Sequence, residues 1–150
     1  MKRKSFRVFS PQFPYPATEG SFHVISQQLI YFCKHYDTEL VIWKDEAKVV
    51  EEKLAERDRF GIPQNLKVTV LRHQEKYPEP QAHRFVRVLK SLASDIASPE
   101  LYYYPELFEE LDALPPADIN LFHYSFCYPW LKRWIGQNKG RNVVYFHNLE

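Results

Sequence analysis

The stretch RVFSPQFPYPATEGSFHVISQQLIYFCKHYDTELVIW, residues 7–43, decides the fold. It covers most of a β-favouring segment at Phe6–Ser10, a proline-rich turn over Pro11–Gly20, a helical segment from Ser21 and an apolar run at Glu39–Trp43. Four apolar residues of the helical segment recur at steps of three and four, which is the spacing of one helix face: Phe22, Ile25, Leu29 and Phe32. A strand, a helix and a second strand in this order predict one unit of a parallel sheet.

The rest of the chain continues this alternation of strands and helices. Further strands are predicted at Leu66–Leu71, Ile119–His123 and Asn142–Phe146. The predicted helices are one from an N-cap at Asp45 through Arg59, one with its buried face at Phe85, Val88, Leu89, Leu92 and Ile96, one over Pro105–Ala113, and one that Pro129 opens. Strands regularly separated by helices predict an α/β fold, a Rossmann-like doubly wound parallel sheet, in one domain over residues 1–150.

Composition narrows the function classes. The chain has 150 residues, of which 45% are hydrophobic, and its net charge is +1, which suits a folded domain and argues against a nucleic-acid binder. No apolar run approaches the length of a membrane span, and the start lacks a signal peptide, so a cytoplasmic location is expected. Cys33 and Cys127 form no metal or redox motif. The basic start, Lys2–Lys4, is either a solubilising terminus or a weak attraction to anionic lipid.

A parallel sheet places its ligands outside the carboxyl ends of the strands. That rule collects the residues that follow each predicted strand: the Tyr15–Ser21 loop, Lys44, His73, His123 with Tyr124, and His147 with Asn148. Gly20 lets the backbone approach a ligand, and the helix after it points its amides and positive dipole end there, which suits an anion such as a diphosphate. A plain strand-to-helix turn is the alternative interpretation.

His147 at a strand tip is the other candidate, because imidazole donates or accepts hydrogen bonds and titrates near neutrality. A surface histidine is the alternative here. The three strand-tip histidines lack metal-ligand spacing, so no metal ion is expected. The chain also lacks the G-x-G-x-x-G and G-x-x-x-x-G-K-[ST] motifs, which argues against a standard NAD site and excludes a P-loop.

Three stretches together resemble the N-terminal half of the retaining GT-B glycosyltransferases of family 4, closest to bacterial members that build polysaccharides. Residues 7–43 are similar to that family's first strand, glycine loop, helix and second strand, with HYDTEL (35–40) at the helix-to-strand junction. ADINLFHYSF (117–126) is similar to the family's "aDvvhvH" strand, and NVVYFHNLE (142–150) to its "vvyxxHN" strand. The resemblance covers the whole chain and is strongest at its two ends.

The resemblance implies a nucleotide-diphosphate sugar as donor and a glycan or lipid-linked acceptor, with no cofactor and no metal. Gly20 and the amide of Ser21 would approach the donor diphosphate or the reacting sugar, and His147 would contact the transferred sugar as the catalytic residue. His123 would lie toward the acceptor, and Asn148 would support the His147 loop. A second, C-terminal GT-B domain would supply most nucleotide contacts, so this chain alone is expected to be inactive.

One residue departs from the family pattern. Where family members often have two adjacent glycines, this chain has Glu19 before Gly20, and a carboxylate beside a diphosphate is unfavourable unless it points away or binds the acceptor. The resemblance also implies work on membrane-linked acceptors, and hence peripheral association with the inner membrane face. The alternative function is a free-standing Rossmann-like binding module that partners a separately encoded catalytic chain. A flavodoxin-like enzyme, which would bind flavin, is a third.

Overall fold

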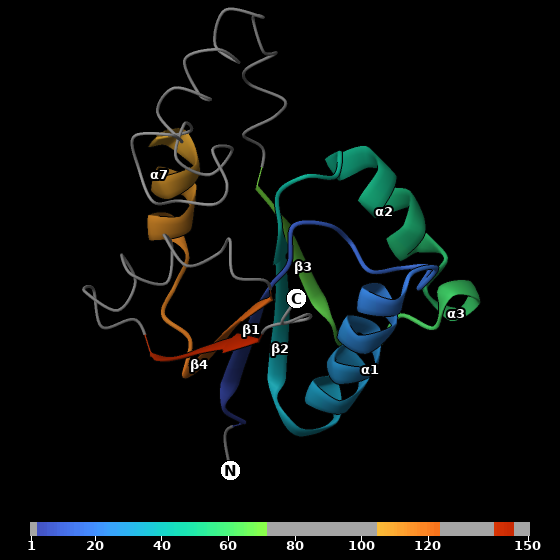
Figure 1. The fold of residues 1–150 in the computed structure, drawn as a ribbon, viewed down its shortest axis with the longest axis horizontal. Coiled ribbons are helices and arrows are strands. Elements are labelled where there is room, and N and C mark those ends of the chain that lie inside the picture. The colour runs from blue at the N-terminus through green and yellow to red at the C-terminus, as the bar shows by residue number, and fades with distance from the viewer. Residues whose placement is uncertain (1–2, 72–104, 124–139, 146–150) are drawn as a thin grey trace, which may run out of the picture.

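The structure is a computed structural model that describes residues 3–71, 105–123 and 140–145. In these ranges five strands form one all-parallel sheet in the order β3-β2-β1-β4-β5 (Figure 1). The strands are β1 (Ser5–Phe9), β2 (Asp37–Ile42), β3 (Lys67–Val70), β4 (Ile119–His123) and β5 (Arg141–Tyr145). The parallel sheet with flanking helices confirms the predicted α/β class and is consistent with a Rossmann-like fold.

The described helices lie on both sides of this sheet. They are α1 (Gly20–His35), α2 (Ala47–Ala55), α3 (Arg57–Phe60) and α7 (Pro105–Ala113). Figure 1 shows α1, α2 and α3 on one side of the sheet and α7 on the other. Right-handed crossovers explain the arrangement, because the chain moves from β1 to β3 in one direction and must return past β1 to reach β4. The two sides are called the α1 face and the α7 face below.

Among the described residues, the core lies mainly on the α1 face. Val8 of β1 and Leu40 of β2 pack there with Ile25 and Leu29 of α1, and each is at most 1% exposed. Burying a side chain of this size contributes about 1.5–3 kcal/mol. The predicted helix face is therefore confirmed: Phe22 and Phe32 are only partly buried but pack against this cluster.

The α7 face of the sheet mixes apolar and charged side chains. Successive residues of a strand point to opposite faces, so Arg7 and Phe9 face away from α1. Phe9 stacks on Phe122 of β4, with ring centroids 4.5 Å apart. Arg7 is 2% exposed and pairs with Glu39 of β2 at 2.7 Å, and the hydroxyl of Thr69 also donates to Glu39 at 2.8 Å. The charge of Arg7 on the central strand is thereby paired with a carboxylate of the neighbouring strand β2, which Thr69 of β3 also contacts.

The predicted elements agree with the structure closely, with one exception. Strands β1, β2, β3 and β5 begin one or two residues from their predicted bounds, while α7 and β4 match theirs. The single helix predicted from an N-cap at Asp45 through Arg59 is wrong, because two helices, α2 and α3, occupy this segment and Glu46 is the N-cap. The carboxylate of Asp45 instead accepts the backbone N–H of Phe13. The helices predicted over 85–96 and from Pro129 lie outside the described residues.

Candidate functional site

The strand order places a topological switch point between β1 and β4. The chain leaves β1 toward β2 on one side, while β4 pairs with β1 on the other side. In open parallel sheets the connections that follow the two strands at such a point diverge and leave a crevice at the carboxyl edge. Two segments therefore lie at the carboxyl edge where open parallel sheets bind ligands: the loop after β1, residues 10–19, and the end of β4 at His123.

The start of the loop after β1 is braced against the end of β2. The amide of Ser10 donates to the carbonyl of Val41 at 3.0 Å. The carbonyl of Pro11 accepts hydrogen bonds from two consecutive amides, those of Trp43 and Lys44, at 3.3 and 2.8 Å. With the bond from the Phe13 amide to Asp45, four contacts tie the two loops together at the carboxyl edge.

The loop has a buried base and an exposed tip. Phe13 and Tyr15 are each 3% exposed, their ring centroids lie 5.4 Å apart, and the Tyr15 hydroxyl points to the carbonyl of Ser26 on α1. Burial raises the pKa of the Tyr15 hydroxyl, and the nearby Cys33 thiol adds to the rise. The residues from Pro16 to Gly20 are exposed, except for the half-buried Ala17. The base therefore holds the exposed tip in front of α1.

The tip leads into an open helix N-terminus. Glu19 is the N-cap of α1 in an extended conformation, its side chain makes no capping hydrogen bond, and the first turn holds no acidic residue. The carbonyl of Glu19 accepts the amide of His23 at 2.9 Å. In the part of the chain that the structure describes, the amides of Gly20 and Ser21 donate to nothing, as expected for the first N–H groups of a helix.

Gly20 borders open space. A Cβ atom built on this residue would meet no heavy atom within 4 Å, and its φ angle lies outside the left-handed region. The fold therefore does not require glycine here. The absence of a side chain at Gly20 leaves its amide open to a ligand, and the chemistry of that approach is hydrogen bonding to an anion or a hydroxyl.

His123 closes the other side of the switch point. It is the last residue of β4, it is fully buried, and its ring lies 5.5 Å from that of Tyr145 at the end of β5. His123 alternates with the buried Phe122, so it belongs to the α1 face. A buried imidazole at a strand end has a fixed orientation, unlike a histidine on the surface.

The structure brings some of the predicted site residues to one edge. Glu19, Gly20 and Ser21 lie together at the start of α1, and His123 ends the strand that neighbours β1. His73, Tyr124, His147 and Asn148 lie outside the described residues, so their positions stay predictions. Sequence reasoning missed the brace that Asp45 provides for the loop, because this contact joins residues 32 positions apart and no local pattern signals it.

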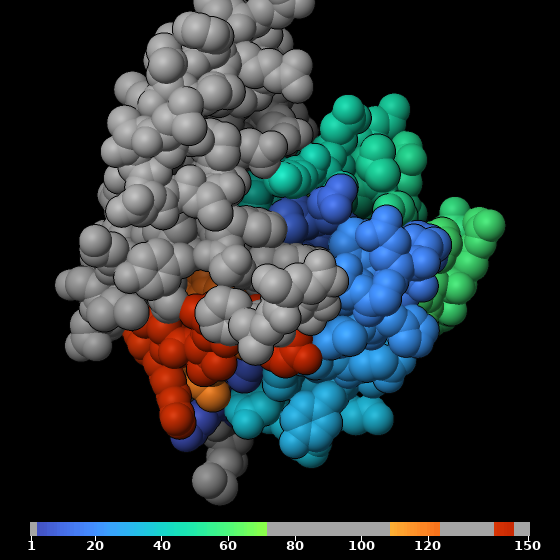
Figure 2. Space-filling model, viewed as in Figure 1, coloured from blue at the N-terminus to red at the C-terminus, as the bar shows by residue number. Residues whose placement is uncertain are grey.

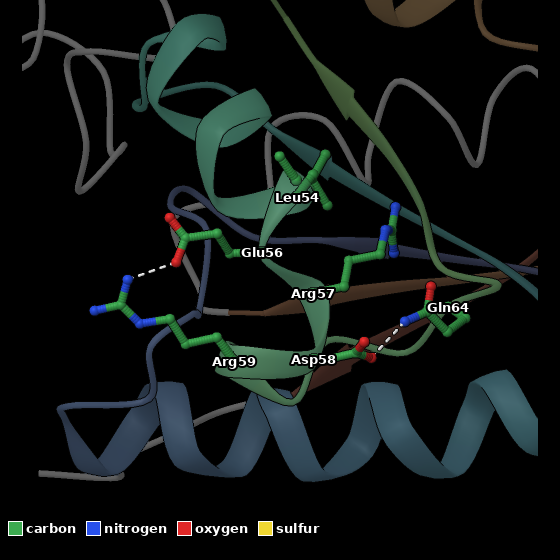
Figure 3. A pocket seen from close by; sticks show the side chains of 7 residues that line it. Leu54, Glu56, Arg57, Asp58, Arg59 and Gln64 are labelled. Atoms are coloured by element: carbon green, nitrogen blue, oxygen red, sulfur yellow. Dashed lines mark hydrogen bonds and ion pairs between the residues drawn. The ribbon is translucent and has the colours of Figure 1, made fainter.

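A shallow pocket elsewhere is a poor alternative site. It measures about 400 Å³ and is lined by residues 54–59 and Gln64 around α3 (Figure 3). Its charged groups already have partners: Arg59 pairs with Glu56 at 2.5 Å, Gln64 donates to Asp58 at 2.8 Å, and Arg57 donates to two backbone carbonyls. All of its lining residues come from one short segment, and none of them is a predicted site residue.

Neither a metal-binding cluster nor a membrane-spanning helix is found in the described ranges. No group of three or more histidine, cysteine, aspartate and glutamate side chains is arranged there to hold a metal ion. Among the helices of those same ranges, none combines the length and the apolar character needed to cross a bilayer.

Comparison with known proteins identifies no relative. The chain matches no protein family, no curated protein and no solved structure.

Proposed function

We propose that this chain is the N-terminal, acceptor-side domain of a retaining glycosyltransferase that uses a nucleotide-diphosphate sugar. The observation that carries the proposal is the open start of α1 at the carboxyl edge, beside the switch point of a parallel sheet. The resemblance of three stretches to family 4 GT-B enzymes agrees with this location, because its glycine loop falls at the same helix start. The acceptor is a glycan or a lipid-linked saccharide.

In this proposal the start of α1 binds the reacting end of the donor. The amides of Gly20 and Ser21 donate to a phosphate oxygen or to a hydroxyl of the transferred sugar, and the helix dipole favours negative charge by about 0.3–1 kcal/mol. Glu19 is exposed at the same point and would repel a diphosphate. The proposal therefore places its carboxylate beside the acceptor saccharide, where it accepts a hydrogen bond from a hydroxyl group.

The remaining groups take the roles that the resemblance implies. His147 contacts the transferred sugar near the reacting carbon, and Asn148 supports the loop that carries it. His123 lies toward the acceptor, and its burial supports a role in holding neighbouring groups in place. Catalysis is electrostatic: positioned donors stabilise the charge on the leaving diphosphate while the acceptor attacks the same face of the sugar.

In this proposal a second domain lies on the opposite side of the donor-binding cleft from this one. That domain supplies most contacts to the nucleotide and a pair of glutamates eight positions apart, so activity requires both halves. A cytoplasmic enzyme that uses lipid-linked acceptors would work at the inner membrane face. Sequencing the gene beyond the codon for Glu150 tests this directly. A stop codon there would favour instead a binding module that partners a separate catalytic chain.

The substitution Gly20→Ala tests the site itself. Because Gly20 borders open space and needs no positive φ, alanine fits the fold and favours the helix, yet its methyl group stands where the ligand would approach. In the complete enzyme we expect kcat/KM to fall about tenfold or more, as for His147→Ala. The control is Lys48→Ala, an exposed change on α2 that should leave activity unaltered. Wild-type turnover by Gly20→Ala would remove the helix start from the mechanism.

A further inference from the structure

Asp45 stands just before α2 but acts on a different segment of the chain. Its half-buried carboxylate accepts the backbone N–H of Phe13 in the loop after β1. The next residue, Glu46, is the N-cap of α2, so Asp45 is not needed as the cap of its own helix. A hydrogen bond to a carboxylate is stronger than one between neutral groups. The carboxylate of Asp45 therefore serves the neighbouring loop.

This bond is the strongest polar anchor of the loop beyond its first residues. Two hydrogen bonds join residues 13–18 to other parts of the described chain. One runs from the Phe13 amide to Asp45, and the other runs from the Tyr15 hydroxyl to the carbonyl of Ser26 at 3.5 Å. The second bond is at the outer limit of hydrogen-bond geometry and is weak. The position of the loop therefore depends mainly on Asp45 and on packing.

Packing carries the position of Phe13 to the start of α1. The ring of Phe13 contacts that of Tyr15, which in turn reaches the buried Ser26 in the second turn of α1. Pro14 and Pro16 fix the φ angles of two loop residues and so stiffen this stretch. In Figure 2 the loop, in dark blue, lies at the surface between α2, in teal, and α1, in lighter blue. A shift of Phe13 should therefore move the exposed tip that leads into α1.

We propose that Asp45 is a positioning residue for the ligand site at the start of α1. By fixing Phe13, it holds the loop in the arrangement that leaves the amides of Gly20 and Ser21 open to an anion. Without this bond the loop samples other arrangements, and the affinity for the ligand falls with the fraction of molecules in the binding-competent one. The inference rests on the proposed role of the α1 start and adds a residue outside the loop on which that role depends.

The sign of the expected effect separates positioning from simple electrostatics. Asp45→Ala removes a negative charge from the carboxyl edge of the sheet, and this change alone would favour the binding of an anion. A loss of anion affinity in this variant therefore reflects the loop and not the charge. Glu46→Ala is the matched control, because it removes the carboxylate of the adjacent exposed residue, whose side chain makes no capping hydrogen bond.

Inorganic pyrophosphate is the probe, titrated into the full chain while NMR follows the amide resonances of Gly20 and Ser21. We expect Asp45→Ala to raise the Kd for pyrophosphate about tenfold or more. Asp45→Asn keeps an oxygen that accepts the N–H of Phe13, so this variant should retain most of the affinity. Glu46→Ala should bind at least as tightly as the unmodified chain. An Asp45→Ala variant with the Kd of the unmodified chain would overturn the proposal.

The ligand-free chain provides a second measurement, which separates this inference from the proposed function. Asp45→Ala should accelerate hydrogen exchange of the Phe13 amide and shift the amide resonances of Gly20 and Ser21, whereas Glu46→Ala should do neither. Circular dichroism checks that each variant is folded. If Asp45→Ala unfolds, Asp45→Ser replaces it, because the shorter side chain stays polar but does not reach the Phe13 amide.

The two measurements have different consequences. An unmodified chain that does not bind pyrophosphate would count against the anion site of the proposed function, and the ligand-free resonances would still decide the role of Asp45. Unchanged resonances of Gly20 and Ser21 in the folded Asp45→Ala or Asp45→Ser variant would refute the positioning role.

Discussion

Replacing Gly140 by alanine is expected to loosen β5 from the sheet. Gly140 precedes this strand and has a φ of +97°, a conformation that side chains rarely adopt. A Cβ atom built there would lie 1.9 Å from the carbonyl oxygen of Ala117 and 3.1 Å from that of Asp118. Both neighbours are backbone atoms, so no side chain can turn aside to make room.

The cost follows from these contacts. Restoring an ordinary carbon–oxygen contact requires a shift of about 1.5 Å, and the same segment holds the hydrogen bond from the Arg141 amide to the Asp118 carbonyl. Backbone strain at such a φ costs on the order of 1–3 kcal/mol. Weakening one ladder hydrogen bond adds about 0.5–1.5 kcal/mol. Together they predict a loss of about 2–4 kcal/mol from a domain stability of roughly 5–15 kcal/mol.

The stability loss of Gly140→Ala is measured by urea unfolding. Alanine substitutions at two other glycines, measured in the same way, distinguish backbone strain from steric collision. Gly61 ends α3 with a φ of +66° but has no atom within 4 Å of its built Cβ, so Gly61→Ala should cost only about 1 kcal/mol. Gly20 has neither problem, so Gly20→Ala should be neutral or stabilise slightly. Hydrogen exchange of the β5 amides should accelerate only in Gly140→Ala. The reasoning fails if Gly140→Ala costs no more than Gly61→Ala.

Three further outcomes are expected. Glu39→Gln should destabilise the fold by about 3 kcal/mol in urea, because the buried guanidinium of Arg7 loses its ionised partner, and a loss below about 1 kcal/mol would contradict this role. Burial raises the pKa of Tyr15, so its contribution to the free energy of unfolding is complete below pH ~10 and is lost as the pH rises further. Tyr15→Phe should therefore reduce the loss of stability at alkaline pH, and an unchanged pH profile of stability would refute this role. Burial also raises the pKa of the Cys33 thiol, so peptide mapping should find its alkylation at least about a hundredfold slower in the native protein than in urea, and comparable rates would show that the thiol is accessible.

Most of the described elements were predictable because their signals are local. The steps of three and four between Phe22, Ile25, Leu29 and Phe32 define a helix face without reference to any other segment. The position of the N-cap, Glu46 instead of the predicted Asp45, was missed for the opposite reason. The N-cap pattern at Asp45 is locally sound, but the carboxylate is taken by the Phe13 amide from the loop after β1. A distant donor thus replaced the local one.

The candidate site likewise combines residues that the sequence identifies with properties that only the structure shows. The glycine before a helix is visible in the sequence, and so is a histidine that ends an apolar run, which is why Gly20 and His123 were predicted to line the carboxyl edge. The structure alone decides that Gly20 borders open space while His123 is fully buried. Exposure depends on which segments pack around a residue, and the residue's own neighbours in sequence do not specify this.

The sequence by itself determined the α/β class, the order of strands and helices and the apolar face of α1, because hydrophobic periodicity and turn residues act within a few positions of the chain. Only the tertiary structure decided the strand order β3-β2-β1-β4-β5 of the described sheet, which creates the switch point between β1 and β4. It also decided the pairing of Arg7 with Glu39 and the contact between Ser5 and Asp118, which are 113 positions apart. Such contacts form only when the whole sheet assembles, so no local pattern encodes them.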